Sequence, residues 1–164
     1  MTAASEAQDE TLDLRRETFT MALYVAICLL AAMLAVPEDS EHAHALGIVW
    51  GISIGLVLAH LFAFRLATRL VNLGAFDAED ARLAAAQLAG GIAAAVLASV
   101  PVILLPADSE ITWAELLLAA LIAAAGYAVA RRAAAHPLTA IAYGLVMLAL
   151  AVGVALLKNH LAGH

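Results

Sequence analysis

Five long apolar stretches, separated by short polar breaks, limit what this chain can fold into more than any other feature. They cover residues 18–36, 46–70, 83–105, 113–130 and 138–157. A helix needs about 20 mostly apolar residues to cross roughly 30 Å of hydrocarbon, and each stretch is close to or above that length. The stretches are continuously apolar and do not alternate at every second residue, which excludes the strands of a membrane β-barrel. The sequence therefore predicts an all-α integral membrane protein, a bundle of five transmembrane helices.

The composition excludes other common classes of protein. Hydrophobic residues make up 65% of the 164 residues and charged residues 13%, whereas soluble domains have roughly 45–50% and 25%. A soluble fold of this size has too little interior for so much apolar surface. The net charge of −6 argues against a nucleic-acid partner, because phosphate binding needs clustered Lys and Arg. The single cysteine, Cys28, excludes a disulfide scaffold.

The polar breaks define the expected domain organisation. Residues 1–17 are predicted to form a polar, acidic and partly helical tail, residues 18–157 one transmembrane domain, and residues 158–164 a short C-terminal tail. All breaks are short, so neighbouring helices should pack as antiparallel hairpins. Thr112 and Glu115 fit a capping box that would start the fourth helix near residue 113.

The basic residues predict the orientation of the bundle. Seven of the eight flank the first stretch or the second and fourth breaks: Arg15, Arg16, Arg65, Arg69, Arg82, Arg131 and Arg132. Because positively charged segments stay on the cytoplasmic side, the N-terminus is expected in the cytoplasm and the C-terminus outside. The first stretch exceeds the 7–15 apolar residues of a signal peptide, so it is expected to remain as an anchor. The alanine-rich composition favours the cytoplasmic membrane of a bacterium.

Small residues predict which helices pack closely. The second stretch carries a ridge of small residues at four-residue spacing, composed of Gly47, Gly51, Gly55, Ala59, Ala63 and Ala67. Small residues at this spacing let helix backbones approach closely in a bilayer. The partner helix could belong to the same chain, to a second copy or to another membrane protein. The alanine-rich third stretch is expected to be the most enclosed helix, and the first and fifth stretches should face more lipid.

Each stretch contributes a polar side chain to the half of the bilayer nearer the cytoplasm. His60 is the only ionisable residue well inside a stretch, and the other members are Ser53, Gln87, Tyr24, Tyr127 and Tyr143. Polar groups in a bilayer are costly unless they are paired, so these side chains should meet one another or water. One interpretation is a path on which His60 takes up and releases a proton near neutral pH. The other is a packing layer in which neutral His60 donates to Gln87 or a tyrosine.

Two other sets of residues could bind ions. Arg65 and Arg69 lie one turn apart at the inner end of the second stretch, where we expect them to contact anionic lipid or to hold an anion. A metal site is possible on the external side, where four residues with imidazole or carboxylate groups lie close together in the sequence: His42, His44, Glu38 and Glu41. These groups are suited to Zn²⁺ or another transition metal. A solvated acidic loop is the competing interpretation of that segment.

Pro101 lies inside the third stretch, near its outer end. A proline there removes one backbone hydrogen bond and should kink the helix. The kink could shape a cavity, or it could be a feature of packing alone.

These features favour transport over catalysis. The sequence contains no GxGxxG, P-loop, HExxH or CxxC motif, so neither an enzyme nor a cofactor is expected. We predict a small channel or transporter for protons or small ions that acts as a homo-oligomer. The alternative is a non-transporting accessory or assembly subunit that packs against a larger membrane protein through its glycine ridge. A third possibility is external binding of a divalent metal.

Overall fold

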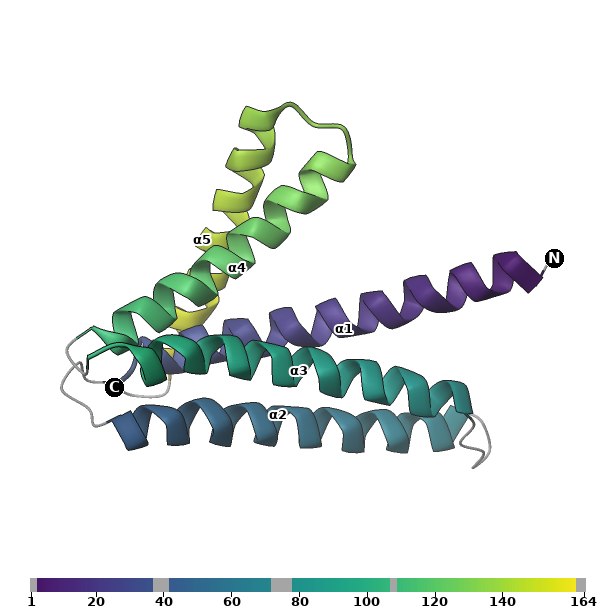
Figure 1. Ribbon diagram of the computed structural model, residues 1–164, viewed down its shortest axis with the longest axis horizontal. Coiled ribbons are helices and arrows are strands. Elements are labelled where there is room, and N and C mark those ends of the chain that lie inside the picture. The colour runs from purple at the N-terminus through teal and green to yellow at the C-terminus, as the bar shows by residue number, and fades with distance from the viewer. Residues whose placement is uncertain (1–2, 37–41, 72–77, 107–108, 162–164) are drawn as a thin grey trace. The chain divides into compact units, whose positions relative to one another are not determined.

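The computed structural model describes residues 3–36, 42–71, 78–106 and 109–161. Their helices are α1 (Ala3–Met33), α2 (His42–Val71), α3 (Ala78–Leu104), α4 (Glu110–Arg132) and α5 (Pro137–Leu161) (Figure 1). Each predicted apolar stretch lies on one of these helices, apart from at most three residues at an end. The helices α1 to α4 are long and apolar enough to cross a membrane, whereas the described apolar part of α5, Pro137–Gly153, is shorter.

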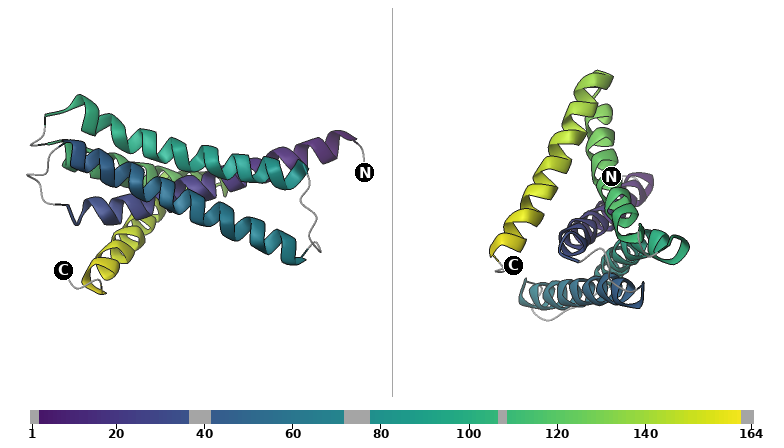
Figure 2. Two further views of the ribbon diagram at one scale, coloured as in Figure 1. Left: turned by 90° about the horizontal axis from the view of Figure 1, so that it is seen from below. Right: turned by 90° about the vertical axis from the view of Figure 1, so that its left-hand side faces the viewer.

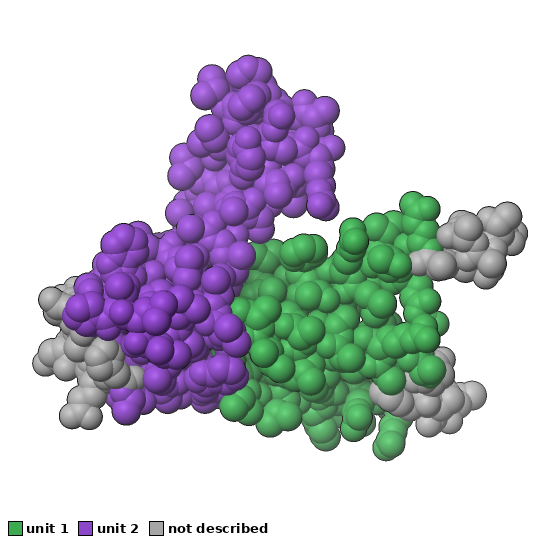
Figure 3. Space-filling model, viewed as in Figure 1, with its two compact units in different colours: residues 1–25, 53–94 green, residues 26–52, 95–164 purple. Residues whose placement is uncertain are grey.

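The chain forms two compact units, shown in different colours in Figure 3. Unit 1 consists of Met1–Val25 and Ser53–Ala94, and unit 2 of Ala26–Ile52 and Ala95–His164. Unit 1 therefore holds the N-terminal part of α1, the C-terminal part of α2 and the N-terminal part of α3. Unit 2 holds the remaining parts of these helices together with α4 and α5, which pack against each other as an antiparallel hairpin (Figures 1 and 2).

In unit 1, α1 and α3 approach each other backbone to backbone at Gly90. A Cβ atom at this position would collide with the carbonyl oxygen of Thr18, and it would lie 3.1 Å from the backbone nitrogen of Ala22. The next residue, Gly91, faces the side chain of Val57 on α2, where a Cβ atom would also collide. The paired glycines of α3 therefore leave the space into which the neighbouring helices pack.

The α4–α5 hairpin of unit 2 is built on the same principle. A Cβ atom on Gly126 of α4 would lie 3.0 Å from the Cα atom of Gly144 on α5. A Cβ atom on Gly144 would in turn lie 2.7 Å from the carbonyl oxygen of Ala123. The buried face of α4 continues from Gly126 at four-residue spacing through Ile122, Leu118 and Ala114.

The turn between α4 and α5 closes with a Schellman motif that lacks the usual glycine. The amide of Ala135 donates to the carbonyl of Ala130, and the amide of Ala134 donates to the carbonyl of Arg131, both at 3.1 Å. Ala134 has a φ of 58°, the left-handed conformation that normally favours glycine at this position. Pro137 then begins α5 in its first turn, where a proline loses no helical hydrogen bond.

The start of α4 differs from the prediction. The helix begins at Glu110 and its N-cap is Ser109, so Thr112 lies inside the first turn and the capping box predicted there is wrong. The carbonyl of Pro106 accepts hydrogen bonds from the amides of Ser109 and Glu110, both at 3.1 Å. This turn after Pro106 starts the helix earlier than the Thr-x-x-Glu pattern indicates.

The burial of the apolar helices can be compared with the enclosure that the sequence predicts. Half of the apolar window of α3 is buried, against 39% for α1, 28% for α4 and 22% for α2. Among these four helices α3 is therefore the most enclosed, as its alanine content predicts. The window of α1 is less buried than that of α3, in the order expected for a helix that faces more lipid than α3. One face of α1 is nevertheless fully buried, through large side chains at four-residue spacing: Met21, Val25, Leu29 and Met33.

Candidate functional site

The small-residue ridge of α2, Gly47 to Ala67, is exposed along its whole length. A Cβ atom built on Gly47, Gly51 or Gly55 comes within 4 Å of no described residue of its own unit. The glycine pairs of α3 and of the α4–α5 hairpin, in contrast, are in close contact with neighbouring helices. The chain thus uses other glycines for packing inside its units, and the ridge with the strongest sequence pattern stays open.

His60 lies beside this ridge in the C-terminal part of α2. It follows Ala59 directly and precedes Ala63 by three residues, which puts its side chain on the flank of the ridge. The imidazole is half-buried and forms no hydrogen bond or ion pair with the described residues. A polar group in this position has to find its partner in water, in lipid headgroups or in another protein chain.

The other polar residues expected at the depth of His60 have different surroundings. Ser53 is buried on α2, on the same face as Val49 and Val57. Tyr24 of unit 1 is exposed, and so are Tyr127 and Tyr143 of unit 2. Among the described residues, none of these side chains forms a hydrogen bond with His60.

Gln87 has a partner that the sequence analysis missed. Its Nε2 atom donates a hydrogen bond of 2.8 Å to Oε2 of Glu17, a residue expected in the solvated tail. Gln87 is only 2% exposed, and its Oε1 atom is buried and accepts no hydrogen bond from the described residues. Glu17 lies four residues before Met21 and eight before Val25, so it shares the buried face of α1. This four-residue spacing is the sequence signal that predicts a buried partner for Gln87.

Glu17 belongs to a polar seam between α1 and α3 in unit 1. One helical turn or more before Gln87, Arg82 of α3 forms an ion pair with Glu10 of α1. Arg16 lies 3.6 Å from the carboxylate of Glu17 and 3.7 Å from that of Asp13. Because Glu10 meets Arg82 and Glu17 meets Gln87, the two helices run in the same direction here. In an up-and-down bundle consecutive helices are antiparallel, so the first and third helices are parallel.

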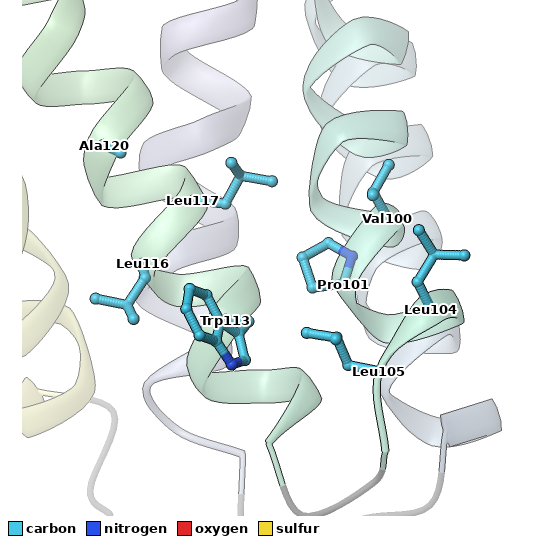
Figure 4. Close-up of a pocket in the computed structure, with 8 residues that line it drawn as sticks. All are labelled: Val100, Pro101, Leu104, Leu105, Trp113, Leu116, Leu117 and Ala120. Carbon is cyan, nitrogen blue, oxygen red and sulfur yellow. The ribbon is translucent and has the colours of Figure 1, made fainter.

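Unit 2 contains an apolar pocket of about 440 Å³ between α3 and α4 (Figure 4). Pro101 of α3 and Leu105, which follows α3, extend toward Trp113 of α4 across it. A pocket beside Pro101 agrees with the expectation that this proline could shape a cavity. Its lining is almost entirely apolar, so it offers no obvious ligand for an ion.

Most of the predicted external metal site lies outside the described residues. This applies to Glu38, Glu41 and the side chain of His42, whereas His44 is described and exposed. Within the described ranges, no group of three or more His, Cys, Asp or Glu residues could hold a metal ion. Glu110, in the polar break between the third and fourth apolar stretches, is fully buried in the first turn of α4, where the helix dipole favours a negative charge.

Arg65 and Arg69, near the C-terminal end of α2, are both exposed, and Arg65 lines a hollow of unit 1. This hollow is a groove between α2 and α3 in unit 1. Arg69, one turn further along the helix, is not part of its wall.

No family model, no curated protein and no solved structure matches this chain. Its function therefore has to be inferred from its own residues and contacts. The length and composition of α1 to α4 indicate a helical membrane protein.

Proposed function

We propose that this protein self-associates through the α2 ridge and conducts protons or small ions past His60. In this proposal α5 is the fifth membrane span, the N-terminus lies in the cytoplasm and the C-terminus lies outside, as the distribution of basic residues predicts. The membrane is the cytoplasmic membrane of a bacterium. The observation that carries the proposal is the position of His60, half-buried and without a described partner, on the flank of an exposed ridge.

The ridge supplies the first step of the argument. In a bilayer, lipid tails are as apolar as leucine, so helices associate where small residues allow close backbone contact. Gly51 and Gly55 are exposed and have open space around them within their units, which leaves them available to another chain. A second α2 helix packed on this ridge would approach as closely as α1 approaches α3 at Gly90.

His60 supplies the second step. Packing along the ridge would bring the His60 side chains of neighbouring copies toward their shared interface, because His60 is three residues from Ala63. An imidazole changes its charge between pH 5 and 8 and can pass a proton from one ring nitrogen to the other. His60 residues at such an interface would form a proton relay within an otherwise apolar span.

The packing inside a single copy favours a conduction path between copies over a path through one copy. The pocket between α3 and α4 is lined by apolar groups, and α3 is closely packed at Gly90 and Gly91. Of the polar side chains buried in unit 1, Gln87 is bound to Glu17, and Ser53 lies on the buried face of α2. His60, in contrast, lies beside the exposed ridge of α2, where a second copy could reach it.

The experiment measures self-association in lipid nanodiscs or mild detergent by native mass spectrometry. Wild type should form a defined oligomer, and Gly51→Leu should shift it to monomers without loss of helical content. Gly153→Leu is the matched control, because Gly153 is also an exposed helical glycine with open space around it. A monomer at all concentrations, or an oligomer that Gly51→Leu leaves intact, contradicts the proposal. A monomer that co-purifies with a larger membrane protein through the same ridge would instead support the accessory subunit.

A further inference from the structure

The turn between α4 and α5 (Figure 1) carries positive charge that no carboxylate nearby in its unit balances. Arg131 and Arg132 lie in the last turn of α4 and His136 in the turn itself, and all three are exposed. The described acidic residues of unit 2, Glu110 and Glu115, lie at the other end of α4. Glu115 is 16 residues before Arg131, or about 24 Å along the helix, and no Asp or Glu follows it in the sequence. This separation is well above the Debye length of about 8 Å in physiological salt, so neither carboxylate neutralises the arginines.

The hydrogen bonds of the turn leave its N–H donors charged or open. Nη1 of Arg131 donates a hydrogen bond of 2.8 Å to the carbonyl oxygen of Ala135, which holds the guanidinium at the turn without neutralising it. Arg132 forms no hydrogen bond or ion pair with the described residues. The amide of Leu138 donates to Nδ1 of His136 at 3.3 Å, so the neutral imidazole carries its proton on Nε2 and adds one more donor. The turn therefore offers several donors and two full positive charges to an anion.

Two other arginines of the chain are neutralised by the protein itself. Arg16 lies 3.7 Å from the carboxylate of Asp13 and 3.6 Å from that of Glu17. Arg82 forms the ion pair with Glu10. An anion drawn to either of these arginines would also meet a carboxylate, which repels it. The arginines of the α4–α5 turn have no such neighbour in the described part of their unit.

Exposed apolar side chains flank the turn on both helices. Val129 of α4 is 58% exposed, and Leu138 and Ile141 of α5 are 71% and 50% exposed. The helix α4 is long and apolar enough to cross a membrane, and its two arginines are its last residues. Basic side chains that directly follow such a lipid-facing span lie where the hydrocarbon meets the headgroups. The anions within their reach are therefore the headgroups of membrane lipids.

We propose that the α4–α5 turn is a contact surface for anionic membrane lipids, on which Arg131 and Arg132 each bind the headgroup of one lipid. Consecutive residues of a helix point about 100° apart, so the two guanidinium groups reach different headgroups. The turn selects net negative charge, because a headgroup that carries its own ammonium group balances its phosphate internally. This inference requires that α4 reaches the membrane surface, and it depends neither on His60 nor on the α2 ridge.

The test is native mass spectrometry of the full chain, titrated with three lipids that have the same acyl chains. Phosphatidylglycerol and phosphatidylcholine share the phosphodiester and differ in net charge, whereas sulfoquinovosyl diacylglycerol is anionic and contains no phosphate. Both anionic lipids should bind about fivefold more tightly than phosphatidylcholine, as expected for one arginine near each anionic headgroup, with two such lipids per chain. Arg131→Gln and Arg132→Gln should each remove one of them, and the double variant should bind all three lipids alike.

Two further comparisons test the role of unbalanced charge. Arg16→Gln is the matched control, because Arg16 is an exposed arginine with carboxylates beside it, and it should change the preference by less than twofold. Ala133→Glu places a carboxylate at the exposed end of α4 and should weaken the preference, whereas Ala133→Gln should keep it. Circular dichroism of each variant separates lost binding from lost folding.

Three results would overturn the proposal. The first is equal binding of phosphatidylglycerol and phosphatidylcholine to wild type, and the second is binding of the sulfolipid no tighter than that of phosphatidylcholine. The third is a preference that the double arginine variant retains, or that Arg16→Gln reduces as much as Arg132→Gln does. None of these results bears on self-association or on ion flux, so failure of this inference is distinguishable from failure of the proposed function.

Discussion

Replacing Gly90 with alanine tests the closest helix contact of unit 1 with the smallest possible change. The added methyl group would collide with the carbonyl oxygen of Thr18 and would lie 3.0 Å from its carbonyl carbon and 3.1 Å from the nitrogen of Ala22. Ordinary contacts of a Cβ atom lie at 3.4–4 Å. All three atoms belong to the backbone of a helix, so no side-chain rotation can relieve the contact, and α1 has to move away from α3.

The expected loss of stability follows from two opposing terms. Alanine favours a helix over glycine by roughly 0.5–1 kcal/mol, which acts in favour of the variant. Overpacking of a close contact usually costs about 1–3 kcal/mol and sometimes more, and displacement of α1 also strains the Glu17–Gln87 hydrogen bond of 2.8 Å. We therefore expect Gly90→Ala to lower the free energy of unfolding by about 2 kcal/mol, close to the middle of that range.

The assay is reversible unfolding in mixed micelles with increasing sodium dodecyl sulfate, followed by circular dichroism. Gly153→Ala is the matched control, because Gly153 is an exposed glycine in a helix outside the ridge and its Cβ position meets open space. The control should be as stable as wild type or up to about 1 kcal/mol more stable, as helix propensity predicts. If Gly90→Ala is as stable as Gly153→Ala, the close approach of α1 to α3 is wrong.

Three further substitutions have expected effects in the same unfolding assay. Glu17→Ala should cost about 1–3 kcal/mol because it leaves both polar atoms of the buried Gln87 amide without partners, whereas Gln87→Leu should stay within about 1 kcal/mol of wild type. The reverse order of these two variants would contradict the contact. Gly144→Ala should destabilise the α4–α5 hairpin by about 2 kcal/mol, since its Cβ atom would lie 2.7 Å from the carbonyl oxygen of Ala123. Ala134→Gly should stabilise the protein by about 0.5–1 kcal/mol by relieving the left-handed backbone, and no gain would argue against that conformation.

The positions of the helices could be predicted from sequence because apolar length and polar breaks determine them directly. The polar breaks and the long hydrophobic runs give the helix ends to within about five residues of those in the structure, except for the start of α1, which lies at Ala3 and not near residue 18. The enclosure of α3 also follows from sequence, because a helix of small residues offers little to lipid and much to neighbouring helices.

The partners of the small residues could not be predicted in the same way. Gly51 and Gly90 are both helical glycines in apolar stretches, yet the first is exposed and the second contacts the backbone of α1. Which glycine is used depends on the helix that comes next to it, and this is a tertiary property. The ridge pattern on α2 indicates that a close contact is possible without saying where the second helix comes from.

Local exceptions to sequence rules account for the other differences. Ala134 adopts the glycine conformation at the end of α4, so the usual glycine signal of a Schellman turn is missing. Glu17 was assigned to a solvated tail because it is charged, although its position in the helical period places it with the buried face of α1. In both cases the residue type favours a different structure from the one that is observed at its position.

Proton flux into proteoliposomes under an imposed membrane potential tests the central claim most directly. Wild type, His60→Ala and His44→Ala are compared at several pH values, with His44 as the control because it is an exposed histidine on the same helix. The account predicts a pH-dependent flux that His60→Ala reduces to the level of protein-free vesicles and that His44→Ala leaves unchanged. Absence of flux for protons, K⁺, Na⁺ and Cl⁻ with wild type, or an unchanged flux with His60→Ala, would contradict it.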